Sequence, residues 1–354
     1  MMEFTYNGLV RYGFGFYNPN HAAALFCAIM PFLWGWKRHA WAGWILSLLL
    51  VVPLALTYSR TGLLILGFEF VAYFVLAKPK NWKLPFGIFL GMVAVAGICG
   101  MLSRFILDQA ITNRPAIWLA GLKLCAANPF GVGLGNSGKI VSAFLLDGIE
   151  CRTLVNSHLT LLAEFGVIAA LVWIALIVYA LLNGVHKRAV WCAFAGLTLS
   201  ACSSSVFDWP LLFDFAEYGQ LTLLNFLLSW ANLLLFLVLG GILICGKPNR
   251  KKLALSAGIA LIGCGLIFAF YSSDTPRLQG GFIVKSGKTT PLVLYSEEWS
   301  LKTVIPYLND GYILPLNPGL FYYPGRQVYL FGNAVEYVEK FSGKEIIFIS
   351  PPEF

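Results

Sequence analysis

Three ionisable side chains lie at the ends of apolar segments that are long enough to cross a membrane. They are Arg60 in Tyr-Ser-Arg-Thr-Gly, Arg114 in Asn-Arg-Pro, and His158 in Asn-Ser-His-Leu. An ionisable group at a membrane boundary is costly unless it faces water, a partner or a substrate, so each is a candidate site residue. Guanidinium groups bind phosphate oxygens, and a neutral imidazole accepts a proton from a hydroxyl. Together they predict an anionic substrate with proton transfer nearby.

His158 is the best candidate for a general base among the four histidines. It opens a long apolar segment directly after a long loop, and Asn156 and Ser157 precede it as hydrogen-bonding groups. A histidine that only begins a helix fits the same position. The other three are His39 and His186, which lie in basic loops, and His21, which either lines a cavity or caps a helix just inside the first apolar segment.

The acidic residues in the apolar segments do not complete a triad with His158. Glu164 follows it by six residues, which is about 240° around a helix, so the two side chains do not share a face. Glu69 lies in the middle of an apolar segment and must be paired, protonated or in a cavity. The sequence has no Asp-x-Asp, His-x-x-x-His or Cys/His cluster, so we expect no metal and no cofactor.

Apolar helices must position these residues. Of the 354 residues, 58% are hydrophobic and 12% are charged, and the mean hydropathy is +0.73. Such a composition is typical of a polytopic membrane protein. We expect about eight transmembrane helices, over residues 17–36, 41–57, 61–77, 84–102, 158–182, 189–206, 222–245 and 253–271.

Four connections between these segments carry basic residues and no acidic ones, which makes them cytoplasmic by the positive-inside rule. They contain Lys37 and Arg38; Lys78, Lys80 and Lys83; Lys187 and Arg188; and Lys247, Arg250, Lys251 and Lys252. The N-terminus, Arg60, the 103–157 loop and the residues after 272 then lie outside. The net charge of +8 fits contact with anionic membrane lipids, and no tract predicts binding to nucleic acid.

The large external loop, 103–157, is predicted to contain a helix and a glycine-rich turn. Asn113 is a good N-cap, and Asn128-Pro129 ends the helix. Arg114 would then lie at a helix N-terminus that binds anions, although the spacing alone slightly favours an interfacial helix whose arginine reaches lipid head groups. Residues 131–136 match no phosphate-binding fingerprint, so we expect the loop to re-enter toward the membrane.

The composition changes from residue 273. Strands are predicted at Pro291–Tyr295, Gly311–Pro315, Gln327–Phe331 and Glu345–Ile349, with helices over Trp299–Leu308 and Asn333–Phe341 between them. This alternation predicts a small α/β unit with a mainly parallel sheet. The expected fold is an all-α polytopic bundle over residues 1–272 with a small external α/β domain over 273–354, which would cap the bundle or dock a partner.

Taken in order, the motifs of this chain resemble the O-antigen ligase and polymerase superfamily of membrane glycosyltransferases. The resemblance covers about residues 8–185. The histidine of the family is commonly followed by Asn, where this chain has Leu159, and relatives usually carry additional helices before the Arg11 region, so we expect helices ahead of the first segment. The matching pieces are Arg11 with Asn18-Pro19-Asn20-x-Ala22; Ser59-Arg60-Thr61-Gly62; Arg114-x-x-x-Trp118 running into Asn128-Pro129-Phe130-Gly131-Val132-Gly133-Leu134-Gly135; and Ser157-His158 with Glu164 and Gly166.

The resemblance implies transfer of a glycan from a polyprenyl-diphosphate carrier to an acceptor hydroxyl, outside the bacterial inner membrane and without a metal. Arg60 and Arg114 would bind the diphosphate, Arg11 would be a further positive contact, and His158 would orient or deprotonate the acceptor hydroxyl. The acceptor is lipid A-core for a ligase; a polymerase that extends the glycan and a ligase for proteins such as pilin are open alternatives. A non-enzymatic transporter of anionic lipids is less favoured, since no internal repeat is visible.

Overall fold

The computed structural model describes most of the helical part of the chain and five short C-terminal strands. By its contacts the chain divides into a first unit, residues 1–112 with 171–261, and a second unit, residues 113–170 with 262–354. The described residues are 3–6, 9–36, 40–77, 87, 91, 114–141, 151–207, 223–245, 249–271, 281–285, 291–295, 311–315, 327–332 and 345–349.

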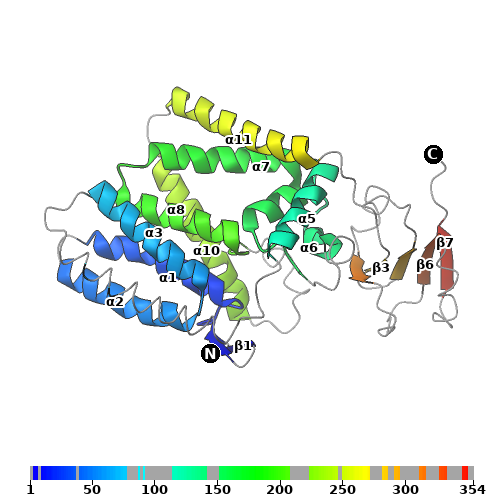
Figure 1. Ribbon diagram of the computed structural model, residues 1–354, viewed down its shortest axis with the longest axis horizontal. Helices are drawn as coiled ribbons and strands as arrows, with labels where there is room; N and C mark the ends of the chain where they lie inside the picture. The colour runs from blue at the N-terminus through cyan, green and yellow to red at the C-terminus, as the bar shows by residue number, and fades with distance from the viewer. Residues whose placement is uncertain are drawn as a thin grey trace. The chain divides into compact units, whose positions relative to one another are not determined.

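The first unit is a bundle of long helices that follows an N-terminal hairpin (Figure 1). The hairpin pairs β1 (Glu3–Tyr6) antiparallel with β2 (Leu9–Tyr12). Helix α1 packs against α2, α3, α8 and α10, and α8 also packs against α3 and α10. The bounds of these helices are Pro19–Trp34 (α1), Ala40–Leu56 (α2), Arg60–Ala77 (α3), Arg188–Ser203 (α8) and Leu223–Ile244 (α10).

Small residues allow α1 and α8 to lie at the centre of this bundle. Ala22, Ala23 and Ala24 of α1 are almost completely buried, as are Ala193 and Ala201 of α8. Helices that pack inside a membrane gain from small side chains at the contact, because the backbones then approach closely. The alanines therefore explain why two helices of modest length make most of the contacts in this unit.

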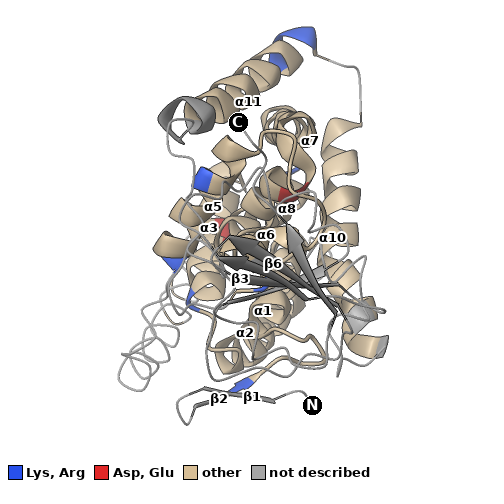
Figure 2. Cartoon of the chain, turned by 90° about the vertical axis from the view of Figure 1, so that its right-hand side faces the viewer, with Lys and Arg blue, Asp and Glu red and all other residues tan. Residues whose placement is uncertain are grey.

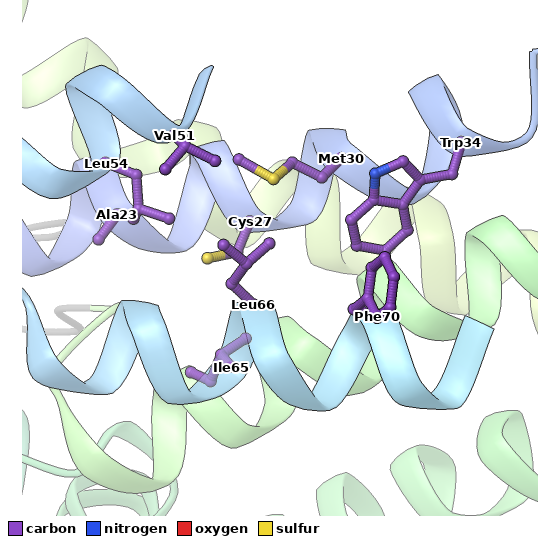
Figure 3. Close-up of a cluster of buried hydrophobic side chains, with 9 residues drawn as sticks. All are labelled: Ala23, Cys27, Met30, Trp34, Val51, Leu54, Ile65, Leu66 and Phe70. Carbon is purple, nitrogen blue, oxygen red and sulfur yellow. The ribbon is translucent and has the colours of Figure 1, made fainter. Parts of the chain in front are cut away.

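The helices α1, α2 and α3 share one compact apolar cluster (Figure 3). Trp34 meets Phe70 in a T-shaped contact with 5.5 Å between ring centroids. The α1 members recur at intervals of three and four residues, which places them on one face of the helix. The cluster consists of Ala23, Cys27, Met30 and Trp34 from α1, Val51 and Leu54 from α2, and Ile65, Leu66 and Phe70 from α3.

Three helices among the described residues are long and apolar enough to cross a membrane: α3, α7 (Ser157–Asn183) and the Leu227–Ile244 part of α10. Helices occupy seven of the eight segments predicted to span, including α11 (Arg250–Tyr271). Figure 2 shows these helices almost entirely in the tan of uncharged residues, with basic residues at the start of α11. The chain is thus a mostly helical membrane protein. The eighth segment, 84–102, falls mainly outside the described residues, and the count of eight spans stays a prediction.

The second unit begins with α5 (Arg114–Ala127), whose bounds agree with the predicted helix between Asn113 and Asn128. Asn128 ends the helix by donating from its backbone N–H and from Nδ2 to the carbonyl oxygen of Leu124, at 3.0 and 3.2 Å. A short helix, α6 (Asn136–Ile140), follows the glycine-rich turn. The first part of α7 also belongs to this unit.

The C-terminal strands form one sheet in the order β5-β3-β4-β6-β7. The four predicted strands are confirmed, but the predicted mainly parallel sheet is wrong: β3 pairs antiparallel with both β4 and β5, and only β4-β6 and β6-β7 are parallel. Strand β3 was not predicted from the sequence. The two predicted helices lie outside the described residues, so the α/β domain and its boundary at 272 stay predictions. The strands are β3 (Gly281–Lys285), β4 (Pro291–Tyr295), β5 (Gly311–Pro315), β6 (Gln327–Gly332) and β7 (Glu345–Ile349).

Candidate functional site

Arg11 connects the hairpin to two helix ends in the first unit. Its Nε donates to the carbonyl oxygen of Thr57 at 2.9 Å, just after α2 ends. One terminal nitrogen of its guanidinium donates to Oδ1 of Asn20, in the first turn of α1, at 3.1 Å. The carbonyl at a helix end has no partner within the helix, so a cation is well placed there. Arg11 therefore holds together the ends of α1 and α2 just before the turn that leads to Arg60.

Arg60 is the first residue of α3, and it follows a tight, capped turn. Tyr58 has a left-handed backbone conformation, with φ of 47°. Ser59 Oγ accepts a hydrogen bond from the backbone N–H of Gly62 at 3.1 Å, which is a helix N-cap. The Arg60 side chain is exposed. A cation at a helix N-terminus opposes the helix dipole, so Arg60 does not stabilise α3. An anion bound there would be attracted both by the helix N-terminus and by the Arg60 guanidinium.

The two other polar groups singled out in the first unit are buried. His21 has no exposed surface; its ring meets Tyr17 edge-on, with 4.9 Å between centroids, and its carbonyl oxygen accepts from Asn232 at 3.1 Å. A buried imidazole cannot reach an acceptor hydroxyl directly, which weakens His21 as an alternative base. Glu69 is equally buried, and a Cβ added at Gly196 of α8 would lie 1.8 Å from its Oε1. The glycine therefore leaves the space that the carboxyl group occupies.

In the second unit, one face of α5 lies against the segment that leads into His158. Trp118 Nε1 donates to the carbonyl oxygen of Val155 at 3.4 Å. A Cβ added at Gly121 would approach Cδ atoms of Leu154 and Leu159 to 2.9 and 3.0 Å, so the backbone of α5 is in close contact there. Residues three and four apart share a helix face. Arg114 lies one turn before Trp118, on the face of α5 that contacts residues 154–159.

His158 lies in the first turn of α7, and its backbone is held by a cap. Asn156 Oδ1 accepts from the backbone N–H groups of His158 and Leu159, at 3.1 and 3.0 Å. The His158 side chain is partly exposed. Just before the cap, Val155 has φ of 51°. A β-branched residue rarely adopts this left-handed conformation, and such strain is found mainly at functional sites, where the surroundings enforce it.

The candidate residues thus form two groups, each organised within its own unit. Arg11 and Arg60 belong to the first, and Arg114 and His158 belong to the second. Glu164, judged a poor partner for His158, accepts a hydrogen bond from Ser137 Oγ at 2.7 Å. The sequence analysis gave Trp118 no role of its own; its spacing of four residues from Arg114 is the signal that could have found it. In the described part of the chain, no three His, Cys, Asp or Glu side chains gather as metal ligands.

Comparison with known proteins gives a match to a family model. Residues 45–174 match the model of the O-antigen ligase family. The match contains Arg60, Arg114 and His158, whereas Arg11 and the C-terminal strands lie outside it. No curated protein and no solved structure matches the chain. Over these residues the chain is similar to the O-antigen ligase family, and its apolar helices are long enough to cross a membrane.

Proposed function

We propose that this protein transfers a glycan from a polyprenyl-diphosphate carrier to an acceptor hydroxyl of lipid A-core, on the periplasmic face of the inner membrane. The observation that carries the proposal is the contact between α5 and the start of α7. It brings the face of α5 that contains Arg114 to the strained, capped turn before His158. Transfer from a diphosphate carrier requires a cation for the diphosphate and a base for the hydroxyl; Arg114 begins α5, and the partly exposed His158 lies in the first turn of α7.

In this proposal, the arginines bind the diphosphate leaving group. A polyprenyl diphosphate carries phosphate oxygens that a planar guanidinium holds with two parallel hydrogen bonds. Arg114 lies at the first residue of α5 and Arg60 at the first residue of α3, so both guanidinium groups start from helix N-termini that attract anions. The charge that develops on the diphosphate as the glycan leaves is thereby stabilised.

His158 serves the acceptor. The acceptor oxygen attacks the anomeric carbon, the bond between that carbon and the diphosphate oxygen breaks, and the acceptor proton passes to the imidazole. Positioned proton removal of this kind contributes about 10²- to 10⁴-fold to a rate. Retention of configuration would require a carboxylate nucleophile. The acids in the described helices, Glu69 and Glu164, are both buried, so we expect a single displacement that inverts the anomeric centre.

Purified protein in lipid vesicles tests the proposal. The donor is a polyprenyl-diphosphate glycan, and the measurement is release of polyprenyl diphosphate together with the anomeric configuration of the product. Separate reactions offer lipid A-core, the donor alone and a pilin protein as acceptor. Transfer to lipid A-core supports the ligase; transfer only to the donor indicates a polymerase, and transfer only to pilin a protein ligase. Movement of the donor across the vesicle membrane without release of polyprenyl diphosphate would indicate a transporter.

The orientation is tested separately. The basic connections place residues 80 and 251 in the cytoplasm by the positive-inside rule. Single cysteines at Lys80 and Lys251 should react with a membrane-impermeant maleimide only after the inner membrane is opened. The parent chain must first lose its eight native cysteines, of which Cys202 and Cys245 are exposed among the described residues. Labelling of either position in intact spheroplasts would contradict the orientation.

A further inference from the structure

The helix that begins with His158 is broken in its middle. Gly166 has φ of 82° and ψ of −179°, a conformation far from helical that only glycine adopts without strain. Residues 157–165 therefore form a short helical segment of their own, ahead of the long remainder of α7. A break of this kind frees backbone N–H and C=O groups, and these must find other partners where water is scarce.

The glycine-rich turn supplies those partners. The backbone N–H groups of Val132 and Gly133 donate to the carbonyl oxygens of Ala163 and Glu164, at 2.9 and 3.1 Å. In return, the N–H of Val167 donates to the carbonyl oxygen of Pro129 at 2.8 Å. Three hydrogen bonds from a segment about 30 residues earlier thus take the place of one turn of helix. The glycine-rich turn therefore pairs with the break in α7.

The two backbones are too close for any side chain between them. A Cβ added at Gly131, whose φ is 87°, would lie 2.4 Å from the carbonyl oxygen of Glu164. A Cβ added at Gly166 would lie 2.5 Å from the carbonyl carbon of Phe130. Both obstructions are backbone atoms, which cannot turn away as a flexible side chain can. Both glycines are therefore required by close approach as well as by conformation.

A buried side-chain hydrogen bond joins the same two segments. Ser137, in α6, donates from Oγ to Oε1 of Glu164 at 2.7 Å, and both residues are almost completely buried. Removing one partner of a buried hydrogen bond leaves the other without its bond, which costs more than the bond itself contributes. Glu164 therefore holds α6 against the last turn of the short segment.

The segment 157–165 depends on these contacts for its orientation. It is nine residues long, and helices this short are not stable alone in water. The Asn156 cap and the Trp118–Val155 hydrogen bond hold its first turn, which carries His158. We propose that residues 129–137 form an interlock with the break in α7, and that Gly131, Gly166, Ser137 and Glu164 are positioning residues that aim His158 at the acceptor. The inference rests on the proposed role of His158 in transfer.

The test compares Glu164→Ala, which removes the acceptor of the Ser137 hydrogen bond, with Glu164→Gln, which keeps an acceptor oxygen. We expect Glu164→Ala to lower kcat about ten- to a hundredfold with an unchanged KM for the donor, because small misplacement of a catalytic group has effects of that size. Glu164→Gln should restore most of the rate. Gly131→Ala should act at least as strongly, and Gly263→Ala, where a Cβ meets nothing within 4 Å, is the matched control.

Hydrogen exchange of the peptide covering residues 128–137 gives a readout that does not depend on activity. The amides of Val132 and Gly133 should exchange slowly in the wild type and in Glu164→Gln, and faster in Glu164→Ala and Gly131→Ala. Fast exchange in the wild type would overturn the interlock, and a wild-type kcat in Glu164→Ala would overturn its positioning role. If exchange follows this pattern but His158→Ala transfers normally, the proposed function fails, and with it the claim that the interlock aims His158.

Discussion

Backbone hydrogen-bonding groups are satisfied differently in two regions: the helices α1, α2 and α3, and the described residues between 114 and 170. The three helices bury alanine, leucine and aromatic side chains in one cluster, and regular hydrogen bonding satisfies most of their backbone (Figure 3). Among its described residues, the second region has five with positive φ, namely Gly131, Gly133, Gly135, Val155 and Gly166. At the break in α7, its backbone groups are satisfied by partners distant in sequence. Irregular backbone in such a protein is tolerated where it is enclosed by protein or lines a cavity.

The difference separates a region held by apolar packing from the region that carries Arg114 and His158 of the proposed site. Packing of regular helices distributes stabilisation over many apolar contacts that are individually weak. The second region places the family motif residues Arg114 and His158 on elements whose orientation depends on single hydrogen bonds and on glycines without room for a methyl group. We therefore expect substitutions in the second region to act on transfer, and substitutions in the apolar cluster of α1, α2 and α3 to act on stability.

The largest effect should come from His158→Ala. We expect the variant to fold and to bind the donor through the arginines, but to lose transfer by at least about a hundredfold, because no base then takes the acceptor proton. Wild-type activity should also fall in acid, since a protonated imidazole cannot accept a proton. The assay is release of polyprenyl diphosphate in vesicles. His186→Ala, an exposed histidine, is the control; near wild-type transfer by His158→Ala would mean that His158 only begins a helix.

Arg114→Lys and Arg60→Lys should have the next largest effect. Lysine keeps the charge but loses the planar group that holds two phosphate oxygens together. We expect about a tenfold loss in kcat/KM for the donor, equivalent to the lost charge-assisted hydrogen bond, with unchanged expression. The exposed Arg152 provides the control variant Arg152→Lys. Normal kinetics in both test variants would assign these arginines to lipid head groups instead.

Trp118→Phe should have a smaller effect on transfer. The variant keeps an aromatic ring against residues 154–159 but loses the donor to the Val155 carbonyl. One neutral hydrogen bond contributes about 1 kcal/mol, so we expect kcat to fall about threefold to tenfold as the strained turn relaxes. Trp41→Phe, at an indole that is 70% exposed, should leave kcat unchanged. An equal loss in both variants would show a general effect of removing tryptophan.

Leu54→Ala should have the smallest effect on transfer and a clear effect on stability. Leu54 is completely buried in the cluster of α1, α2 and α3. Its truncation leaves a cavity that costs about 2–5 kcal/mol of unfolding free energy, while the folded fraction keeps its kcat. Thermal unfolding in detergent measures the loss of stability, and the transfer assay in vesicles measures kcat. The matched variant is Leu49→Ala on the same helix, where the side chain is 60% exposed; it should unfold like the wild type.

The sequence predicted most of the helices, four C-terminal strands and the resemblance to a family. Seven of the eight apolar segments are helices, α5 has the bounds that Asn113 and Asn128 indicate, and four C-terminal strands lie where the pattern placed them. The family match over residues 45–174 confirms the resemblance that the ordered motifs carried. These features could be predicted because hydrophobic runs, caps and turn residues act locally, within a few residues of the element that they define.

Only the tertiary structure decided how the elements meet. The segment 158–182 is predominantly apolar and predicts one unbroken helix, yet α7 breaks at Gly166, where the backbone of residues 129–133 supplies hydrogen bonds. The same holds for other hydrogen bonds, namely those from Arg11 to Thr57 and Asn20 and from Trp118 to Val155. They join segments that are far apart in sequence or that have no periodic pattern. Such pairings depend on which groups the folded chain brings within hydrogen-bond distance, and no local propensity encodes that distance.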